Sequence, residues 1–252
     1  MPQEEILHTK VLDNVAVITF GHPAGNSFPL AQLDRLTQEL KELQNNEKVS
    51  IILLQSEGTG AFCAGASFNE LLEVSNLIEG TRFFSGFANV INAIRKSGKI
   101  IIGRIHGKAV GGGVGLAAAC DYAFATKESS IKLSEIAIGI GPFVIEPVVS
   151  RKIGKTAMAN MALEPAEWKS AEWAFQKGLY ARVFDSIEEM DVALNQFIDT
   201  LKSYNPEALF ELRKTLWEET EHWDTLLYER AAISGKLVLS DFTKNALKRF
   251  QK

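Results

Sequence analysis

The stretch from Ile100 to Ala125 constrains the fold more than any other part of this 252-residue chain. It begins with an apolar run, breaks into three consecutive glycines at positions 111–113, and resumes as small residues that end at Asp121. This order predicts a buried strand, a glycine turn, a tightly packed helix and a second strand. The amino end of such a helix presents unpaired backbone N–H groups, and glycines let a ligand atom approach them. We therefore expect a site for a negatively charged oxygen at this turn.

The glycine run does not match either common phosphate-binding motif. No Lys-Ser/Thr pair follows it, and the spacing of Gly111 to Gly115 is not that of a dinucleotide fingerprint. A purely structural interpretation remains open, in which the glycines only let a helix pack closely on a sheet. The functional interpretation needs a second segment that brings another donor to the same oxygen.

Composition and charge exclude several classes of function. Hydrophobic residues make up 46% of the chain and charged residues 23%, as in an ordinary globular protein. A formal net charge of −4 gives no general attraction to nucleic acid or to an anionic membrane. No apolar run approaches the roughly 18 residues of a membrane span, and the polar start lacks a secretory apolar core. Cys63 and Cys120 lie among small apolar residues, which predicts buried free thiols and a cytoplasmic protein.

Strand and helix patterns alternate over the first 185 residues or so, which predicts an α/β fold with parallel pairing. The expected strands are 6–12, 15–20, 50–55, 100–105, 122–125 and 130–133. The expected helices are 29–45, one from Phe68 with Leu71, Val74 and Ile78 on one side, 83–97, 144–153, 156–162, 170–177 and 187–204. Beyond Ser186 the pattern is amphipathic and helical, over 207–219, 223–238 and 242–250. These last apolar faces must pack on the core or on a neighbouring subunit.

A second segment shares the design of the glycine turn. Residues 63–66 read Cys-Ala-Gly-Ala, carry no bulky side chain, and precede a predicted helix. Two backbone N–H groups that converge on one oxygen from such segments would form an oxyanion hole. The loss of one donor in such a site costs about 100- to 1,000-fold in rate.

These segments, in this order and spacing, resemble the crotonase superfamily, also called the enoyl-CoA hydratase/isomerase family. The residues that carry the resemblance are His22-Pro23 with 26–28, 61–66, 107–115, 120–121, 134–135 with Gly139 and Pro142, 170–174 with 178–179, and 205–208. The resemblance implies a spiral of ββα units over residues 1–186 and a helical trimerisation region over 187–252. It also implies a homotrimer or a dimer of trimers that binds acyl-CoA thioesters, with no part for nucleic acid or a membrane.

The resemblance also implies roles for particular residues. The amides of Ala66 and Gly112 would hold the thioester oxygen as it becomes an enolate, and Glu135 would be the acid/base. The backbone of Ala64 would face the adenine of coenzyme A. Further substrate contacts would come from Gly65, Gly111, Phe68, Pro142 and Phe143. No metal is implied, and no separate cofactor, because coenzyme A is part of the substrate.

The acid–base residues favour one reaction over another. Family hydratases carry two glutamates, and this chain has Gly115 at the first of those positions and Glu135 at the second. Hydration must orient and deprotonate a water while a proton reaches the α-carbon, which two carboxylates share well. Isomerisation of a double bond needs only one base that takes a proton and returns it two carbons along. Apolar neighbours such as Ile138 should raise the pKa of Glu135, which suits this role.

Two alternatives stay open. The first is hydration by Glu135 alone or with a helper such as Glu146, whose simpler interpretation is a carboxylate in the first turn of a helix. The second is a non-catalytic trimer that binds acyl-CoA. Other polar residues have plain interpretations: Glu70 and Glu73 as solvated helix residues, His106 as a satisfied strand histidine, and Lys99 and Arg104 as solvated strand ends or phosphate contacts.

Overall fold

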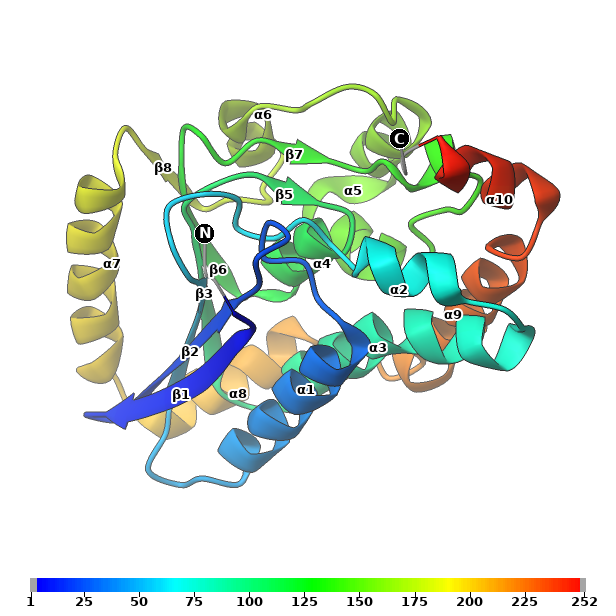
Figure 1. Ribbon diagram of the computed structural model, residues 1–252. Coiled ribbons are helices and arrows are strands. Elements are labelled where there is room, and N and C mark those ends of the chain that lie inside the picture. The colour runs from blue at the N-terminus through cyan, green and yellow to red at the C-terminus, as the bar shows by residue number, and fades with distance from the viewer. Residues whose placement is uncertain (1–3, 250–252) are drawn as a thin grey trace.

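A six-stranded sheet forms the centre of the computed structural model, which describes residues 4–249 (Figure 1). Its strand order is β1-β2-β3-β4-β6-β8. Only β1 and β2 pair antiparallel, and every later neighbour pairs in parallel. The bounds are β1 Ile6–Leu12, β2 Val15–Gly21, β3 Ile51–Ser56, β4 Ile100–Ile105, β6 Tyr122–Thr126 and β8 Arg182–Phe184.

The first two strands form the predicted hairpin. Asp13 and Asn14 both have positive φ angles, of 48° and 67°, which is the geometry of a turn that matches the twist of a hairpin. In β3 and β4 nearly every side chain is buried, because helices cover both faces of a parallel sheet. One core lies under α1, α3 and α4, and a second lies under α7.

A second, two-stranded sheet lies beside the first. β5 (Ala109–Val110) pairs in parallel with β7 (Ile131–Lys132), and Cys63 forms a bridge to Ala109. β5 was not among the expected strands, because two residues are too short for a periodic pattern. The small sheet carries the chain directly into the glycine turn and into residue 135.

Helices surround both sheets. Their bounds are α1 Leu30–Gln44, α2 Phe68–Glu73, α3 Leu77–Lys96, α4 Gly112–Ala119, the 3₁₀ turn η1 Glu135–Ile138, α5 Glu146–Leu163, α6 Ala171–Gln176, α7 Ile187–Lys202, α8 Pro206–Leu216, α9 Trp223–Leu237 and α10 Asp241–Lys248. Gly154 has φ 78° and kinks α5 between the two helices expected there.

The expected boundary between α2 and α3 is wrong. The apolar spacing from Leu71 to Ile78 predicted one continuous helix, but α2 ends at Glu73 and α3 begins at Leu77. The Asn76 side chain accepts a hydrogen bond from the Glu79 N–H at 3.0 Å and starts the new helix there. Ile78 is consequently on the surface, at 82% exposed. The hydrogen bond of the Asn76 cap therefore decides where α3 begins, against the apolar spacing that predicted a continuous helix.

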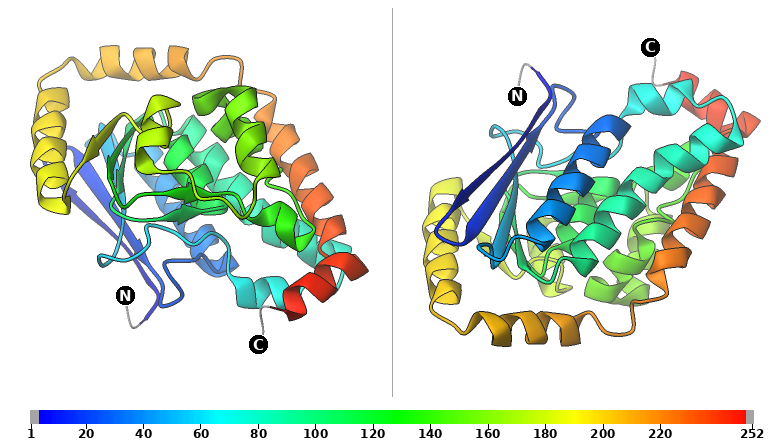
Figure 2. Two further views of the ribbon diagram at one scale, coloured as in Figure 1. Left: turned by 90° about the horizontal axis from the view of Figure 1, so that it is seen from above. Right: turned by 90° about the horizontal axis from the view of Figure 1, so that it is seen from below.

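The helices α7, α8, α9 and α10 run around the outside of the molecule (Figure 2). α7 covers one face of the sheet, α8 crosses to the far side, and α9 lies along α3. The predicted α/β fold with a helical C-terminal part is therefore confirmed. The apolar tail is only partly buried within the chain: Trp217 and Leu227 are buried, whereas Leu212 and Leu216 are 53% and 54% exposed. Phe250, the last expected helix residue, lies outside the described residues.

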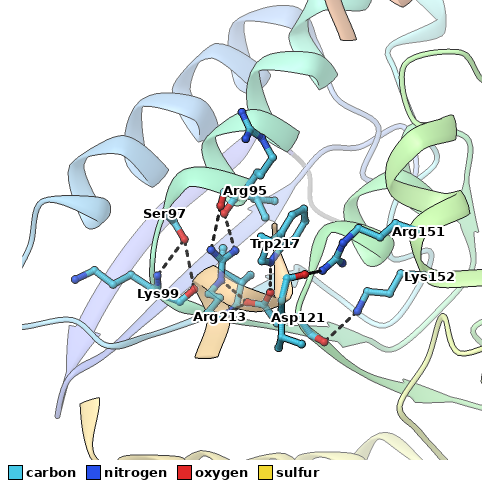
Figure 3. Close-up of polar contacts among 11 residues, drawn as sticks. Arg95, Ser97, Lys99, Asp121, Arg151, Lys152, Arg213 and Trp217 are labelled. Atoms are coloured by element: carbon cyan, nitrogen blue, oxygen red, sulfur yellow. Dashed lines mark hydrogen bonds and ion pairs between the residues drawn. The ribbon is translucent and has the colours of Figure 1, made fainter. Parts of the chain in front are cut away.

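A buried polar cluster around Asp121 attaches α8 to the sheet (Figure 3). The Asp121 carboxylate accepts hydrogen bonds from Arg213 Nε and Trp217 Nε1, both at 2.7 Å, and from the Ile101 N–H at 2.8 Å. Arg213 also donates to the carbonyl oxygens of Ile94 and Arg95 at the end of α3. Since Arg213 is the buried residue of α8, this cluster fixes where that helix lies.

Within residues 4–249, no helix is both long and apolar enough to cross a bilayer. In the same part of the chain, no three His, Cys, Asp or Glu side chains are grouped to hold a metal ion.

Candidate active site

A cavity of about 180 Å³ lies where the small sheet meets α2, α3, η1 and α9. Its wall is mostly apolar, and Glu135 is the only ionisable side chain among the described residues that line it. The lining residues are Ala64, Gly65, Ala66, Phe68, Leu71, Phe83, Phe84, Phe87, Val110, Gly111, Gly112, Ser134, Glu135, Ile138, Ile140, Gly141, Pro142, Phe143, Val144, Ile145 and Ser234.

Two backbone amides border this cavity. Gly65 O accepts from Phe28 and the Ser67 N–H donates to Phe28, so the N–H of Ala66 between them points to the opposite side. Gly112 is the first residue of α4, where the amide has no helical acceptor. No hydrogen bond from either amide is found within residues 4–249. The two segments touch, since a Cβ on Gly65 would lie 3.5 Å from the Gly112 nitrogen.

Gly111 brings Glu135 against the glycine turn. Its φ of 54° and ψ of −118° are accessible to glycine alone. A Cβ at this position would lie 2.8 Å from Glu135 Oε1, so any side chain would displace the carboxylate. Glycine at position 111 therefore allows both the backbone turn and the close approach of the Glu135 carboxylate.

The Glu135 carboxyl group is buried and incompletely paired. Its Oε2 atom has no hydrogen-bond partner in the described chain. Burial raises the pKa of Glu135 to about 7, against a smaller opposing effect of hydrogen bonds from the backbone amides of Glu135 and Ser134. A carboxyl with this pKa takes up and releases protons near neutral pH, which is what a proton-transfer group requires.

The space at the position of the missing first glutamate is filled by Ile145, the residue just before α5. A Cβ on Gly115 would lie 2.5 Å from Ile145 Cγ2 and 2.9 Å from Ile145 Cβ. Both residues are fully or almost fully buried. The isoleucine side chain thus occupies the space that any side chain at position 115 would need, and the cavity keeps a single carboxyl group among the described lining residues.

The structure brings all nine of the predicted site residues to one cavity. Ala66, Gly112 and Glu135 line it together with the six predicted substrate contacts. These six are Ala64, Gly65, Gly111, Phe68, Pro142 and Phe143. Ala64 is exposed and so lies at the mouth, whereas Gly65 and Gly111 are buried. Their roles in catalysis and binding stay predictions.

Other polar residues lie outside the cavity. Glu146 is held by Lys155 and Ser150, both on α5, and these partners lower its pKa despite partial burial. Arg104 pairs with Asp191 on α7, and Lys99 donates to the Asn46 carbonyl. These contacts give the residues structural roles.

Two of the plain interpretations are wrong. Glu70 is not merely solvated, because its Oε2 accepts the Leu30 N–H at 2.7 Å and so caps α1. His106 is buried and follows β4, but its Nε2 has no partner in the described chain. Burial lowers the pKa of His106 to about 4, and the Arg104 charge adds to this. The thiol of Cys63 is buried with a pKa raised to about 12, as expected of a packing residue.

The part of the cavity wall that comes from α9 was not predictable from the sequence. Ser234 comes from α9, about 100 residues after Glu135, and no local spacing points to it. It reaches the cavity because α9 lies unusually close to α3: a Cβ on Gly80 would be 2.7 Å from the Gly235 carbonyl oxygen. The contact between two glycines is thus what makes a C-terminal helix part of the wall.

An α/β fold with a mostly apolar cavity, two backbone amides at its border and a buried carboxyl group suits proton transfer next to a carbonyl group. Comparisons with known proteins show the family of the chain. The sequence model of the family "Enoyl-CoA hydratase/isomerase" matches residues 10–249. The short-chain-enoyl-CoA hydratase of Clostridium acetobutylicum is 31% identical over 184 residues, which are 71% of this chain and 69% of the relative.

Two further relatives extend the comparison. The peroxisomal Delta(3,5)-Delta(2,4)-dienoyl-CoA isomerase of Arabidopsis thaliana is 24% identical over 233 residues, covering 86% of this chain and 82% of the isomerase. The crystal structure of an enoyl-CoA hydratase from Bacillus halodurans superposes with a TM-score of 0.90 at 20% identity, over 96% of this chain and 99% of that one. Four other relatives are matched over only 54% to 59% of their length.

The chain therefore belongs to the enoyl-CoA hydratase/isomerase family, the crotonase superfamily, and is an enzyme of that family. The family acts on acyl-CoA thioesters. The resemblance that the motifs carried is confirmed.

Proposed function

We propose that this protein is an enoyl-CoA isomerase that moves a double bond along the acyl chain with Glu135 as its only acid/base. Two observations support the proposal most. Glu135 is the single carboxyl group among the described residues that line the cavity, and Ile145 fills the space beside Gly115. A second acid has no room at position 115 without a change at Ile145.

In the proposed reaction, the thioester oxygen lies against the amides of Ala66 and Gly112. The Glu135 carboxylate takes a proton from the α-carbon of a 3-enoyl thioester, and the electron pair spreads into a dienolate whose negative oxygen accepts both N–H groups. Glu135, now protonated, returns the proton to the γ-carbon. The product is the conjugated 2-enoyl thioester, and no water is consumed. The pKa of about 7 lets one carboxyl group serve in both steps.

The acyl part of the substrate is proposed to be an uncharged hydrocarbon chain. Phenylalanine, leucine, isoleucine and valine side chains form most of the wall, and none of the described lining residues is Lys, Arg or His. A carboxylate on the acyl chain would lose its water shell with no cation to replace it.

The test compares two substrates and two variants. Purified protein is incubated with a 3-enoyl-CoA and with crotonyl-CoA, and absorbance of the conjugated thioester is followed. We expect the absorbance to rise with the first substrate and to stay constant with the second. Glu135→Gln should lower the isomerase rate about 100-fold or more. Glu146→Gln, which removes the salt-bridged carboxylate of α5, is the matched control and should retain the rate.

Hydration by Glu135 is the second candidate, and the Clostridium relative, named a hydratase, favours it. Loss of the conjugated absorbance of crotonyl-CoA, without any 2-enoyl product from the 3-enoyl ester, would establish hydration instead. Binding of both esters without turnover would support the acyl-CoA-binding alternative.

A further inference from the structure

One polar side chain of the cavity wall has no part in the chemistry above. Among the described lining residues, only Ser134, Glu135 and Ser234 carry polar side chains. The first two are adjacent in the chain, whereas Ser234 comes from α9. Ser234 is only 1% exposed, so its hydroxyl group is shut off from bulk water. A hydroxyl group in this position needs a hydrogen-bond partner from the protein or from the contents of the cavity.

The protein does not supply that partner. Hydroxyl groups inside helices often donate to the carbonyl oxygen four residues earlier. Thr37 donates in this way to Leu33 at 2.8 Å, and Ser85 donates to Thr81 at 2.7 Å. The Ser234 hydroxyl has no hydrogen bond of this or any other kind within the described chain. It therefore stays available to a ligand in the cavity.

Helix α3 shows how far this hydroxyl lies from the glycine turn, because α9 runs along it (Figure 2). The Phe87 ring packs against Gly112, where an added Cβ would lie 2.3 Å from the ring. Gly80 contacts Gly235, the residue after Ser234. Gly80 and Phe87 lie on the same face of α3, two turns or about 10 Å apart. Ser234 is therefore well beyond the carbons that react beside the Gly112 amide.

We propose that Ser234 donates a hydrogen bond to an uncharged oxygen, a hydroxyl or keto group, on the distal part of the acyl chain. Phe83 and Phe84 also line the cavity, so the chain between the thioester and this oxygen is hydrocarbon. A carboxylate does not suit the position, because none of the described lining residues is Lys, Arg or His. The inference rests on the proposed function for the place of the thioester, and it adds one neutral oxygen to the hydrocarbon chain.

Close packing of α9 on α3 does not account for the hydroxyl group. The crossing needs small residues, and alanine at position 234 would be as small as serine. Ala231 and Gly235 already fill this role on the buried face of α9. A buried hydroxyl without a partner destabilises a fold relative to an apolar group of the same shape. Ser234→Ala should therefore leave the Tm unchanged or raise it, whereas a structural role for the hydroxyl would lower it.

The first experiment varies the substrate at one atom. KM and kcat are measured for 3-enoyl-CoA esters that carry a hydroxyl, a keto or a methyl group at successive carbons beyond the γ-carbon. For the native protein, the best hydroxyl or keto ester should have a KM about ten-fold below that of its methyl counterpart. Ser234→Ala should remove this difference by raising the KM of the oxygenated ester alone. The kcat should stay unchanged, because the hydroxyl lies far from the reacting carbons.

Ser85→Ala is the matched control. It removes a serine hydroxyl from α3 that is bonded within its own helix and is not among the described lining residues. This variant should keep the native preference. A native protein without a preference, or a preference that Ser234→Ala retains, would overturn the assignment. Equal KM changes for the oxygenated and methyl esters in Ser234→Ala would also overturn it, because they would reflect packing alone.

A binding measurement keeps this test independent of turnover. Saturated acyl-CoA esters with the same hydroxyl, keto and methyl groups have no double bond to move, and they are titrated calorimetrically into the native protein and Ser234→Ala. Tighter binding of an oxygenated ester by the native protein, lost in the variant, supports the assignment. Equal binding of the oxygenated and methyl esters by the native protein contradicts it. If no thioester is turned over, the proposed reaction fails and the titration still decides the role of Ser234.

Discussion

At the scale of single residues, the site depends on the carboxyl group of Glu135, whose burial disfavours its charged form. Glu135 carries a buried oxygen with no partner in the described chain, and its pKa lies near 7 instead of 4.5. A charge that is poorly solvated costs stability whenever it is ionised. The same burial that tunes the group for proton transfer should therefore destabilise the fold at high pH.

This cost predicts a pH-dependent effect of Glu135→Gln on stability. Between the unfolded pKa and the folded value of about 7, the folded state binds more protons, so stability falls as pH rises through this window. The variant should be more stable than the native protein at pH 8, by at most about 3 kcal/mol, and should show little difference at pH 4.5. Urea denaturation at both pH values measures this. A variant less stable than the native protein at pH 8 would contradict the assigned burial cost.

The chemistry of these residues was predictable from sequence in part. Glu135 and the two glycine-containing segments have recognisable order and spacing. The filled space beside Gly115 was not predictable, because Ile145 lies 30 residues further along and its contact arises only after folding. Sequence showed that one acid is absent, and the structure showed why no side chain fits there.

At the scale of elements, two helix contacts position the site. The first is the crossing of α3 and α9, where Gly80 and Gly235 let the helices approach. A Cβ on Gly235 would lie 2.6 Å from the Thr81 nitrogen and 2.8 Å from the Gly80 carbonyl carbon, which are backbone atoms that cannot rotate away. The spacing of the helices therefore depends on both glycines.

Gly235→Ala should push α9 away from α3 and widen the acyl cavity at Ser234. The gain in helix propensity is about 1 kcal/mol, whereas overpacking of this kind costs about 1–3 kcal/mol, so a net loss of stability is expected. The Tm and the KM for a 3-enoyl-CoA measure the two effects, and KM should rise. Ile233→Ala, on the exposed face of the same helix, is the control. An unchanged Tm and KM for Gly235→Ala would mean that the helices adjust without consequence.

The second contact is the buried pair that anchors α8. Arg213→Met would leave the Asp121 carboxylate without its guanidinium partner and free the carbonyl oxygens at the end of α3. Breaking a buried ion pair from one side costs about 3–5 kcal/mol. Chemical denaturation should show this loss, and Lys214→Met at the next, exposed position should change stability by less than about 0.5 kcal/mol. Similar values for the two variants would refute the anchoring role.

Elements were predicted best where a pattern is long. The strands β1, β2, β3, β4 and β6 and the helices after residue 186 follow from runs of buried or periodic residues, whereas the three-residue edge strand β8 was not expected. The division of α2 from α3 was wrong because the Asn76 cap is a single side-chain contact. The two-residue strand β5 has no pattern of its own, although it carries the glycine turn.

At the scale of the whole molecule, α8 leaves apolar surface uncovered within the chain. Phe210, Leu212 and Leu216 are each about half exposed, and α8 has Arg213 as its buried residue. Exposed apolar surface of this kind is typical of an interface with another chain. The trimeric assembly expected from the resemblance would cover such a face.

Sedimentation should therefore show a trimer or hexamer of the native chain. Leu212→Glu would bring a charge into the covered face and should shift the distribution towards smaller species. Leu12→Glu, at a distant hairpin tip where Leu12 is 74% exposed, is the matched control. A native protein that sediments as a monomer at micromolar concentration would contradict the expectation.

The contact between Gly115 and Ile145 has a consequence for how this enzyme could change its reaction. Gain of a second acid at position 115 requires two substitutions, and their order matters. A glutamate introduced first would meet the Ile145 side chain, whereas a smaller residue introduced first at position 145 would remove the contact with Cγ2 and leave a void for the second change to fill. We therefore expect laboratory evolution towards hydration to change position 145 before position 115.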